Sequence, residues 1–421
     1  MIPERKLADW LRDLEHLHPV EIELGLDRVA EVAHRLGLTS RQVRVVTVAG
    51  TNGKGSVVAL LDQLLRASGQ RVGRYMSPHL HDFRERAVIQ GFMLPDRDWV
   101  QAFERIEVAR ASISLTYFEY TTLAALLLFQ AANLDVWVLE VGMGGRLDAV
   151  NIVDADVAVI TSIDLDHTEW LGPDREAIGR EKAGILRPQG LCVVGDLNPP
   201  QSVCTMVRQL GVETRWMGVD FAVESSGQGC WLRLGTVRHF FPKCRLAPAN
   251  IATALQALQM LLPAALDLVR FETVIAQCGL PGRCEVCPGD ARVILDVAHN
   301  PHGARFLAEQ LQDFPEATRT WVVLAMLKDK DRRGTVKALG SIATGFYLAD
   351  LAGPRGGMAA ELAEYVHEGI ACVMGQFATP EQALEQALHQ AGPNDRIVVC
   401  GSFYTVAAAR HGLGMWSQVD G

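Results

Sequence analysis

The sequence contains no hydrophobic run long enough to cross a membrane. Its longest apolar stretches, residues 123–129 and 136–139, are far shorter than the ~20 residues that a membrane-spanning helix needs. The first residues run directly into an amphipathic pattern and lack the apolar core of a secretory signal peptide. We therefore expect a cytoplasmic protein that does not associate with membranes.

Positive charge is also in short supply. The 421 residues include 40 lysines and arginines against 49 aspartates and glutamates, which gives a formal net charge of −9. Proteins that bind the phosphate backbone present a basic surface, so this balance argues against a nucleic-acid partner.

Cysteines are few and form no pattern that indicates disulfides. The nine cysteines are scattered and odd in number, which is typical of reduced thiols in a cytoplasm. Cys284 and Cys287 have the spacing of a metal-binding pair, but no second cysteine or histidine pair with suitable spacing follows. The sequence therefore predicts no structural zinc site.

The remaining composition, 49% hydrophobic and 21% charged, is that of an ordinary globular chain. Strands alternate with helical patterns in both halves, so the predicted fold class is α/β. We expect a first domain with a parallel sheet over residues 1–283, which includes a small antiparallel patch. A linker over residues 284–291 and a smaller Rossmann-like α/β domain over residues 292–421 follow; residues 280–290, which lead into and include most of this linker, hold two prolines and two glycines. No G-x-G-x-x-G follows a strand of the second half, so a dinucleotide site is not supported there.

The most informative stretch is a β-branched run, residues 43–48, followed by G-T-N-G-K-G-S, residues 50–56. A strand, a glycine-rich turn and a helix direct backbone N–H groups and the positive end of the helix at an anion. Lys54 adds charge for phosphate oxygens, and Ser56 offers a hydroxyl to Mg²⁺ or phosphate. The common P-loop has a glycine where this sequence has Val48, and here a glycine separates Lys54 from Ser56. We interpret the stretch as a variant P-loop that binds a nucleotide, which makes residues 1–283 a P-loop ATPase-type parallel-sheet domain; the alternative is a tight turn.

Polar residues follow other predicted strands. Ser77 follows a short strand, Glu140 ends an apolar run, and His167 lies in the segment S-I-D-L-D-H-T after the next strand. Because the carboxyl ends of parallel strands meet at one edge, Glu140 and His167 are expected near the P-loop, where an acid can meet Mg²⁺. Ser77 is either a magnesium ligand or a turn residue.

Two further segments allow a functional or a purely structural interpretation. Residues 7–14 and 27–36 predict amphipathic helices that are either a flap over the site or two packing helices. Residues 114–122 carry three aromatic side chains beside Glu119 and precede a predicted helix over residues 123–132. These aromatics either stack on a flat heterocycle or belong to the core.

Eight motifs, in order along the chain, resemble the folylpolyglutamate synthase and dihydrofolate synthase family of the Mur ligase superfamily. They are GTNGKGS (50–56), SPHL (77–80), EVGMGGRLDAVN (140–151), DHTEWLG (166–172), GREKAGI (179–185), LPGR (280–283), DVAHNPHG (296–303) and GSFYTV (401–406). Together they are highly specific. The N-terminal segment and residues 114–122 resemble the bifunctional bacterial type, which uses dihydropteroate as well as folates.

The resemblance implies an ATP-dependent ligase. It would add L-glutamate to dihydropteroate, forming dihydrofolate, and further glutamates to tetrahydrofolate. ATP would phosphorylate a substrate carboxylate, and the amine of L-glutamate would attack the acyl phosphate to give an amide, ADP and phosphate. The protein would position the reactants and neutralise phosphate charge, and the family suggests a monomer.

The resemblance also implies roles at matching positions. Catalytic roles fall on Lys54, His167 and Lys182; periodicity alone makes Lys182 an ordinary helix lysine, but it matches the lysine that the family carbamylates (N6-carboxylation). Two Mg²⁺ sites would use Ser56, Ser77, Glu140, His167 and the modified Lys182. ATP would contact Thr51, Asn52, Gly53, Lys54, Gly55, Ser56, Asn250, Arg283 and Asp296. The pterin would lie near His16, Leu17, His18, Pro19, Thr116, Tyr117, Phe118, Glu119, Leu147, Asp148 and Ala149. Glutamate would lie near His299 and Ser402.

Other functions remain to be distinguished from this one. The chain could be a folylpolyglutamate synthase only, or another Mur-type amide ligase such as one acting on peptidoglycan precursors, although no separate N-terminal domain for a uridine nucleotide is evident. A rival of another class is a switch that hydrolyses ATP to move its domains. Strict dependence on a pterin and an amine would exclude the switch.

Overall fold

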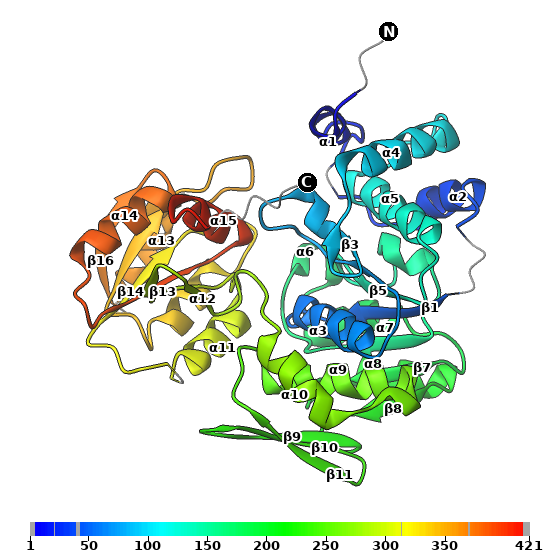
Figure 1. Cartoon of the computed structure of the whole chain (residues 1–421). Helices are drawn as coiled ribbons and strands as arrows, with labels where there is room; N and C mark the ends of the chain where they lie inside the picture. Colours follow the sequence, from blue (N-terminus) through cyan, green and yellow to red (C-terminus); the bar gives the residue numbers. More distant parts are fainter. Residues whose placement is uncertain (1–4, 21, 39–42, 313, 369–370, 416–421) are drawn as a thin grey trace. The chain divides into compact units, whose positions relative to one another are not determined.

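The computed structural model describes residues 5–20, 22–38, 43–312, 314–368 and 371–415. The chain divides into two compact units, residues 1–278 and 279–421, and each is described by itself (Figure 1). Among the described residues, no helix has both the length and the apolar character required to cross a membrane.

The first unit contains an eight-stranded sheet with the strand order β4-β3-β2-β5-β1-β6-β7-β8. The six strands from β2 to β8 in this order run parallel, whereas β3 and β4 are antiparallel additions at one edge. The strands are β1 (Arg44–Ala49), β2 (Val72–Tyr75), β3 (Ala87–Ile89), β4 (Phe92–Met93), β5 (Val136–Glu140), β6 (Val157–Ile160), β7 (Leu191–Val194) and β8 (Glu213–Trp216).

Helices cover both faces of this sheet, which explains why its central strands are apolar throughout. In β1, Val46 and Val48 enter one core, whereas Val45 and Ala49 enter the other. The helices are α1 (Leu7–Leu14), α2 (Asp27–Arg35), α3 (Lys54–Ala67), α4 (Asp96–Arg110), α5 (Tyr117–Ala131), α6 (Thr168–Leu171), α7 (Arg175–Ala183), α8 (Gln201–Leu210), α9 (Pro248–Leu261) and α10 (Leu268–Gln277). Short 3₁₀ helices are η1 (Phe83–Arg86), η2 (Ala149–Ile152) and η3 (Pro263–Ala265).

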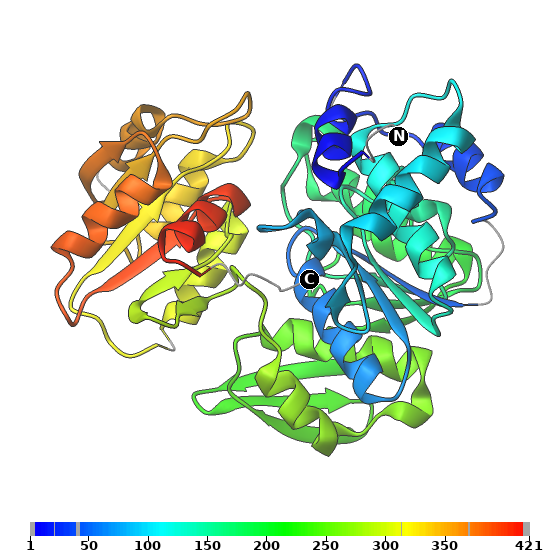
Figure 2. The ribbon, with the colours of Figure 1, turned by 45° about the horizontal axis from the view of Figure 1, so that its top comes forward.

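The small antiparallel sheet expected from the sequence is present. It has the order β11-β10-β9 and packs against α9 and α10 (Figure 2). Its strands are β9 (Phe221–Ser226), β10 (Gly229–Leu234) and β11 (Val237–Pro242).

The N-terminal helices pack on α4 and α5, because α1 buries its apolar stripe there. The Trp10 ring lies 5.8 Å from the Phe103 ring and 6.5 Å from the Tyr120 ring. Tyr120 is fully buried and its hydroxyl donates to the Phe103 carbonyl, so this one of the three aromatics is a core residue. Residues 16–19 lie in the loop between α1, which ends at Leu14, and α2, which begins at Asp27.

The second unit contains a six-stranded sheet with the order β12-β13-β17-β14-β15-β16, in which only β12 is antiparallel. The strands are β12 (Glu285–Cys287), β13 (Asp290–Leu295), β14 (Thr320–Leu324), β15 (Gly345–Ala349), β16 (Cys372–Phe377) and β17 (Arg396–Cys400). The helices are α11 (Pro301–Leu311), α12 (Arg332–Leu339), α13 (Ala359–Val366), α14 (Pro380–Gln390) and α15 (Phe403–Gly412). The α/β class, with a parallel-sheet first part and a second sheet domain, is confirmed.

Two local expectations need correction. Helix α5 begins at Tyr117 rather than at residue 123, because Thr116 and Glu119 form a capping box that starts the helix earlier. Residues 284–291, expected to be a linker, contain β12 and the turn into β13, because the Val286 and Ile294 backbones pair as neighbouring strands. Cys284 is buried in the core of the second unit, and Cys287 ends β12; both carry reduced thiols.

Candidate active site

The glycine-rich turn after β1 is held by backbone geometry that only glycine permits. Gly50 has φ of 152°, and a Cβ there would lie 1.7 Å from Thr161 Oγ1. Gly53, the residue before α3, has φ of 87°, and a Cβ there would lie 2.5 Å from the Asn250 side chain. Asn250, on the first turn of α9, is thereby placed against the P-loop although it is far away in sequence.

Neighbouring strand ends fix the turn from the other side. Thr51 Oγ1 accepts from the Asp164 backbone N–H and donates to the Asp164 carbonyl, each at 3.0 Å. Thr161 Oγ1 donates to the Asn52 carbonyl at 2.7 Å. Thr161 and Asp164 were not singled out from the sequence as supports of the P-loop, since only the pairing of β1 with β6 brings them there.

Two lysines converge on one backbone oxygen of this turn. Lys54 Nζ donates to the Gly50 carbonyl at 3.1 Å, and Lys182 Nζ, from α7, donates to the same oxygen at 2.9 Å. Lys182 is only 4% exposed. Burial, followed by the charge of Lys54, lowers the pKa of Lys182 to about 7, against the opposing effect of Asp166 and Asp148. Near neutral pH a substantial fraction of this amine is therefore uncharged.

The residues proposed as metal ligands gather around the P-loop from separate strands. Glu140 ends β5 beside Val48 of β1, is 5% exposed, and accepts from the Ser77 backbone N–H at 3.3 Å. A Cβ on Gly55 would lie 3.6 Å from Glu140 Oε2, which places that carboxylate against the start of α3. Ser56 is buried one residue further along α3. Carboxylate and hydroxyl oxygens of this kind are the ligands that Mg²⁺ prefers.

His167 precedes α6 in a left-handed conformation, with φ of 51°. Its Nε2 lies 3.9 Å from Asp166 Oδ2, and its backbone N–H donates to Asp166 Oδ1 at 2.9 Å. In the described part of the chain, no group of three histidine, cysteine, aspartate or glutamate side chains is arranged to hold a metal ion. The predicted ligand set is of another kind, because it relies on hydroxyls and on a modified lysine.

Asp148 lies in the loop after β5, between Leu147 and Ala149, and is 3% exposed. Burial raises its pKa to about 6, although its carboxylate accepts from the backbone N–H groups of Met143 at 2.8 Å and Val150 at 3.1 Å. Through these two hydrogen bonds Asp148 stabilises the glycine-containing turn that follows β5, residues 142–145. A Cβ on Gly142 would lie 2.5 Å from the Phe118 ring, so the same turn is packed against the start of α5.

The segments expected near the pterin lie on neighbouring elements of the first unit. His18 is 8% exposed as a side chain, and both its ring nitrogens are engaged: Nδ1 with Ser114 Oγ at 2.8 Å and Nε2 with Glu23 at 2.7 Å. Glu119 Oε2 accepts from the Thr116 backbone N–H at 2.7 Å. The centre of the Tyr117 ring lies 5.3 Å from the central carbon of the Arg86 guanidinium. His18 and Glu119 thus have partners within the protein.

The second unit gathers its predicted residues at the carboxyl ends of β13 and β17, which are neighbours. Asp296 accepts from the backbone N–H groups of Cys284 at 2.9 Å and Ala298 at 2.8 Å, and burial raises its pKa. His299 Nδ1 donates to the Val297 carbonyl at 2.9 Å. Ser402 is 3% exposed and caps α15 by accepting from the Thr405 backbone N–H at 3.0 Å. The Arg283 guanidinium lies 5.4 Å from the centre of the Phe403 ring at the start of the same helix.

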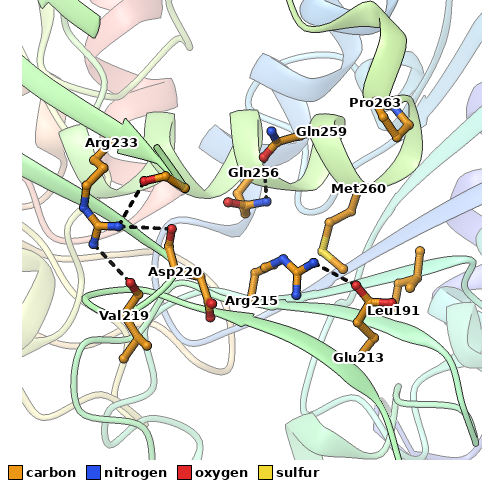
Figure 3. A pocket seen from close by; sticks show the side chains of 11 residues that line it. Leu191, Glu213, Arg215, Val219, Asp220, Arg233, Gln256, Gln259, Met260 and Pro263 are labelled. Carbon is orange, nitrogen blue, oxygen red and sulfur yellow. Dashed lines mark hydrogen bonds and ion pairs between the residues drawn. The ribbon is translucent and has the colours of Figure 1, made fainter. Parts of the chain in front are cut away.

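A cavity of about 610 Å³ lies in the first unit, at the amino ends of β7 and β8 (Figure 3). Leu191 and Glu213 begin those strands, and Gln256 and Met260 reach the cavity from α9. The Arg215 guanidinium is already paired with Glu213 at 2.8 Å. None of the predicted site residues lines this cavity.

Comparison with known proteins identifies the family. The model of the Mur ligase middle domain matches residues 48–199, and that of the Mur ligase glutamate ligase domain matches residues 282–403. The dihydrofolate synthase/folylpolyglutamate synthase of Escherichia coli K12 is 46% identical over 404 residues, covering 95% of this chain and 94% of the relative. The chain belongs to the dihydrofolate synthase/folylpolyglutamate synthase family. The enzyme of the same name from Haemophilus influenzae is 40% identical, covering 95% of this chain and 96% of the relative.

Solved structures of this family extend the similarity to the fold. E. coli FolC in complex with DHPP and ADP matches with a TM-score of 0.92 at 43% identity, covering 98% of each chain. A bifunctional folylpolyglutamate synthase/dihydrofolate synthase with Mn, AMPPNP and L-glutamate bound matches with a TM-score of 0.90 at 44% identity, covering 97% of this chain and 98% of the other. The recognition drawn from the eight motifs is confirmed.

Proposed function

We propose that this chain is a bifunctional ligase that uses ATP to join L-glutamate to dihydropteroate and further glutamates to tetrahydrofolate. The observation that carries the proposal is the convergence of Lys54 and Lys182 on the Gly50 carbonyl, with Glu140 against the same turn. Two lysines and a buried acid at a helix N-terminus suit a triphosphate with a divalent cation. Two relatives that align with 95% of this chain are named dihydrofolate synthase/folylpolyglutamate synthase.

The first step needs phosphate charge to be neutralised at the P-loop. Lys54 supplies a cation beside the backbone N–H groups at the start of α3, which is the arrangement that stabilises a transferring phosphoryl group. Ser56, Ser77, Glu140 and His167 would hold the cation, which supplies Lewis-acid polarisation of phosphate oxygens when bound. The protein's own contribution is position, because a carboxylate attacks phosphorus only when the two are held in line.

Lys182 is suited to carbamylation. Its lowered pKa leaves the amine nitrogen able to bond the carbon of CO₂, with one N–H proton lost to solvent. The product is a carbamate anion, an oxygen ligand that suits a second cation. Modification also replaces the partly protonated amine beside the Gly50 carbonyl with an anion.

We assign capture of the amine substrate to the second unit, because the glutamate ligase model matches it and because His299 and Ser402 follow two of its parallel strands. Arg283 and Asp296, together with Asn250 of the first unit, are proposed as nucleotide contacts. We further propose that the ligase acts as a cytoplasmic monomer without membrane partners and, since the chain is acidic overall, without nucleic-acid partners.

The test is phosphate release from Mg²⁺-ATP and L-glutamate, with dihydropteroate and tetrahydrofolate supplied in separate reactions. We expect release with each acceptor and none without an acceptor. Lys54→Ala is expected to abolish release with both, since phosphate charge is then uncompensated, whereas the exposed Lys337→Ala on α12 serves as the control.

The pattern of results separates the rival functions. Release with tetrahydrofolate alone would reduce the protein to a folylpolyglutamate synthase. Release that needs no acceptor would support an ATP-driven switch instead of a ligase.

A further inference from the structure

Arg28 occupies a position that local helix physics does not favour. It lies in the first turn of α2, which begins at Asp27 after Leu26, a residue that supplies no side-chain cap. A cation at a helix N-terminus opposes the helix dipole. Residues that break a local rule of this kind are expected where function or tertiary structure requires them.

The tertiary contacts of Arg28 supply that requirement. One guanidinium nitrogen pairs with the Glu23 carboxylate, and the other donates to the Glu23 carbonyl and to Glu119 Oε1, each at 3.1 Å. Glu119 is 5% exposed as a side chain, whereas Arg28 is 24% exposed. We call this set, Glu23, Arg28 and Glu119, the Arg28 bridge.

The Arg28 bridge connects the loop between α1 and α2 with the start of α5, two segments that are far apart in sequence. On one side, Glu23 accepts from His18 Nε2 at 2.7 Å, and His18 Nδ1 meets Ser114 Oγ at 2.8 Å. On the other side, the second oxygen of Glu119 accepts from the Thr116 backbone N–H at 2.7 Å. The loop between α1 and α2 is therefore fastened to the first turn of α5 by a continuous series of hydrogen bonds.

We propose that Arg28 is a positioning residue for the acceptor substrate, because its bridge sets the distance between residues 16–19 and residues 116–119. The inference rests on the proposed function, which assigns those two segments to the pterin. The Arg28 Nε is buried without a hydrogen-bond partner among the described residues. The guanidinium fork is thus oriented toward the two carboxylates even though one N–H group is left unsatisfied.

That unsatisfied group distinguishes a positioning role from a merely structural one. Lysine keeps the charge and removes the buried N–H group, so a structural role alone predicts that Arg28→Lys is tolerated. A lysine ammonium cannot reproduce the fork that meets two carboxylates at fixed angles. Positioning therefore predicts that Arg28→Lys loosens acceptor binding without unfolding the protein.

The experiment measures steady-state phosphate release by the full-length wild type, Arg28→Lys and Arg28→Met, with dihydropteroate varied at saturating ATP and L-glutamate. We expect KM for dihydropteroate to rise about tenfold or more, with kcat and the KM for ATP changed by less than about threefold. Arg35→Met is the matched control, because Arg35 lies on the same helix in an exposed ion pair with Glu31. It is expected to retain wild-type constants.

A second measurement tests whether Glu23 and Arg28 act as one unit. Glu23→Gln and Arg28→Met are expected to raise KM for dihydropteroate by similar factors, and their combination by little more than either alone. Independent, multiplying effects would overturn the bridge.

The remaining outcomes are also decisive. A wild-type KM in Arg28→Lys, or a parallel rise of the KM values for ATP and dihydropteroate, would overturn the positioning role while leaving the proposed function intact. Absence of release by the wild type with dihydropteroate would overturn the proposed function and this inference with it.

Discussion

At the scale of single residues, the site is dominated by buried groups whose charge is disfavoured. Lys182 is enclosed next to Lys54, and Asp148 is enclosed among backbone N–H groups, so burial lowers the pKa of the lysine and raises that of the acid. Both shifts bring the groups toward the pH at which the enzyme would work. Perturbed groups of this kind are concentrated at functional sites.

The Lys182 pKa has a measurable consequence for stability. In the unfolded chain this amine binds a proton up to pH 10.5, whereas in the folded protein it does so only below about 7. Between these values the unfolded state binds more protons, so stability rises with pH. Lys182→Met removes this dependence and is expected to be more stable than the wild type at pH 7, by roughly 2–4 kcal/mol, with the difference shrinking toward pH 10.

Urea unfolding of both proteins between pH 7 and 10, in buffer free of Mg²⁺ and CO₂, measures this difference. A difference that stays constant across that range would contradict the assigned pKa. The same variant is expected to have lost ligase activity, so stability and function change in opposite directions.

At the scale of elements, the turn between β1 and α3 depends on Gly50. We expect Gly50→Ala to destabilise the protein by about 3 kcal/mol or more, because a Cβ would overlap Thr161 Oγ1 and the backbone there has φ of 152°. Gly227→Ala is the matched control, since a Cβ at that position would have none of the described residues within 4 Å. Thermal unfolding of the two variants is the measurement, and equal midpoints would show that the turn can adapt.

Some helices and strands can be predicted from the sequence alone, and others cannot. The β-branched run and the apolar run before Glu140 predict β1 and β5, because a strand covered by helices on both faces must be apolar throughout. The predicted start of α5 is wrong, although the T-x-x-E pattern of Thr116 and Glu119 is present to indicate the true one. Strand β12 escapes prediction because three residues between prolines and glycines have no periodicity to detect.

The candidate active site can be predicted only in part from the sequence, because many of its contacts join residues that are distant along the chain. Motifs identify Lys182 and Gly50 separately, but their contact joins residues 132 positions apart and depends on how α7 packs beside the sheet. The supports at Thr161 and Asp164, and the Arg28 bridge, likewise arise from tertiary neighbours. No local pattern distinguishes such residues from other polar residues at strand and helix ends.

At the scale of the whole molecule, each unit has a hydrophobic core of its own. In the second unit, strands β14, β15 and β17 pack against α11, α12 and α13, and the Arg410–Glu285 ion pair ties α15 to β12. We expect residues 279–421, expressed alone, to unfold cooperatively in urea with helix and strand signals in circular dichroism, and to lack ligase activity. The full chain under the same conditions is the reference, and a gradual transition without cooperativity would contradict the independence of this unit.

The two lysines at the Gly50 carbonyl have one more consequence. When Lys182 is protonated, its ammonium group and that of Lys54 repel one another across their common acceptor, and an arriving polyphosphate would attract both. Part of the energy that binds the nucleotide is therefore relief of a penalty already present in the folded chain. Resistance of the enzyme to heat and proteases would then follow the cell's supply of ATP, so that a depleted cell would hold not only an idle ligase but also a shorter-lived one.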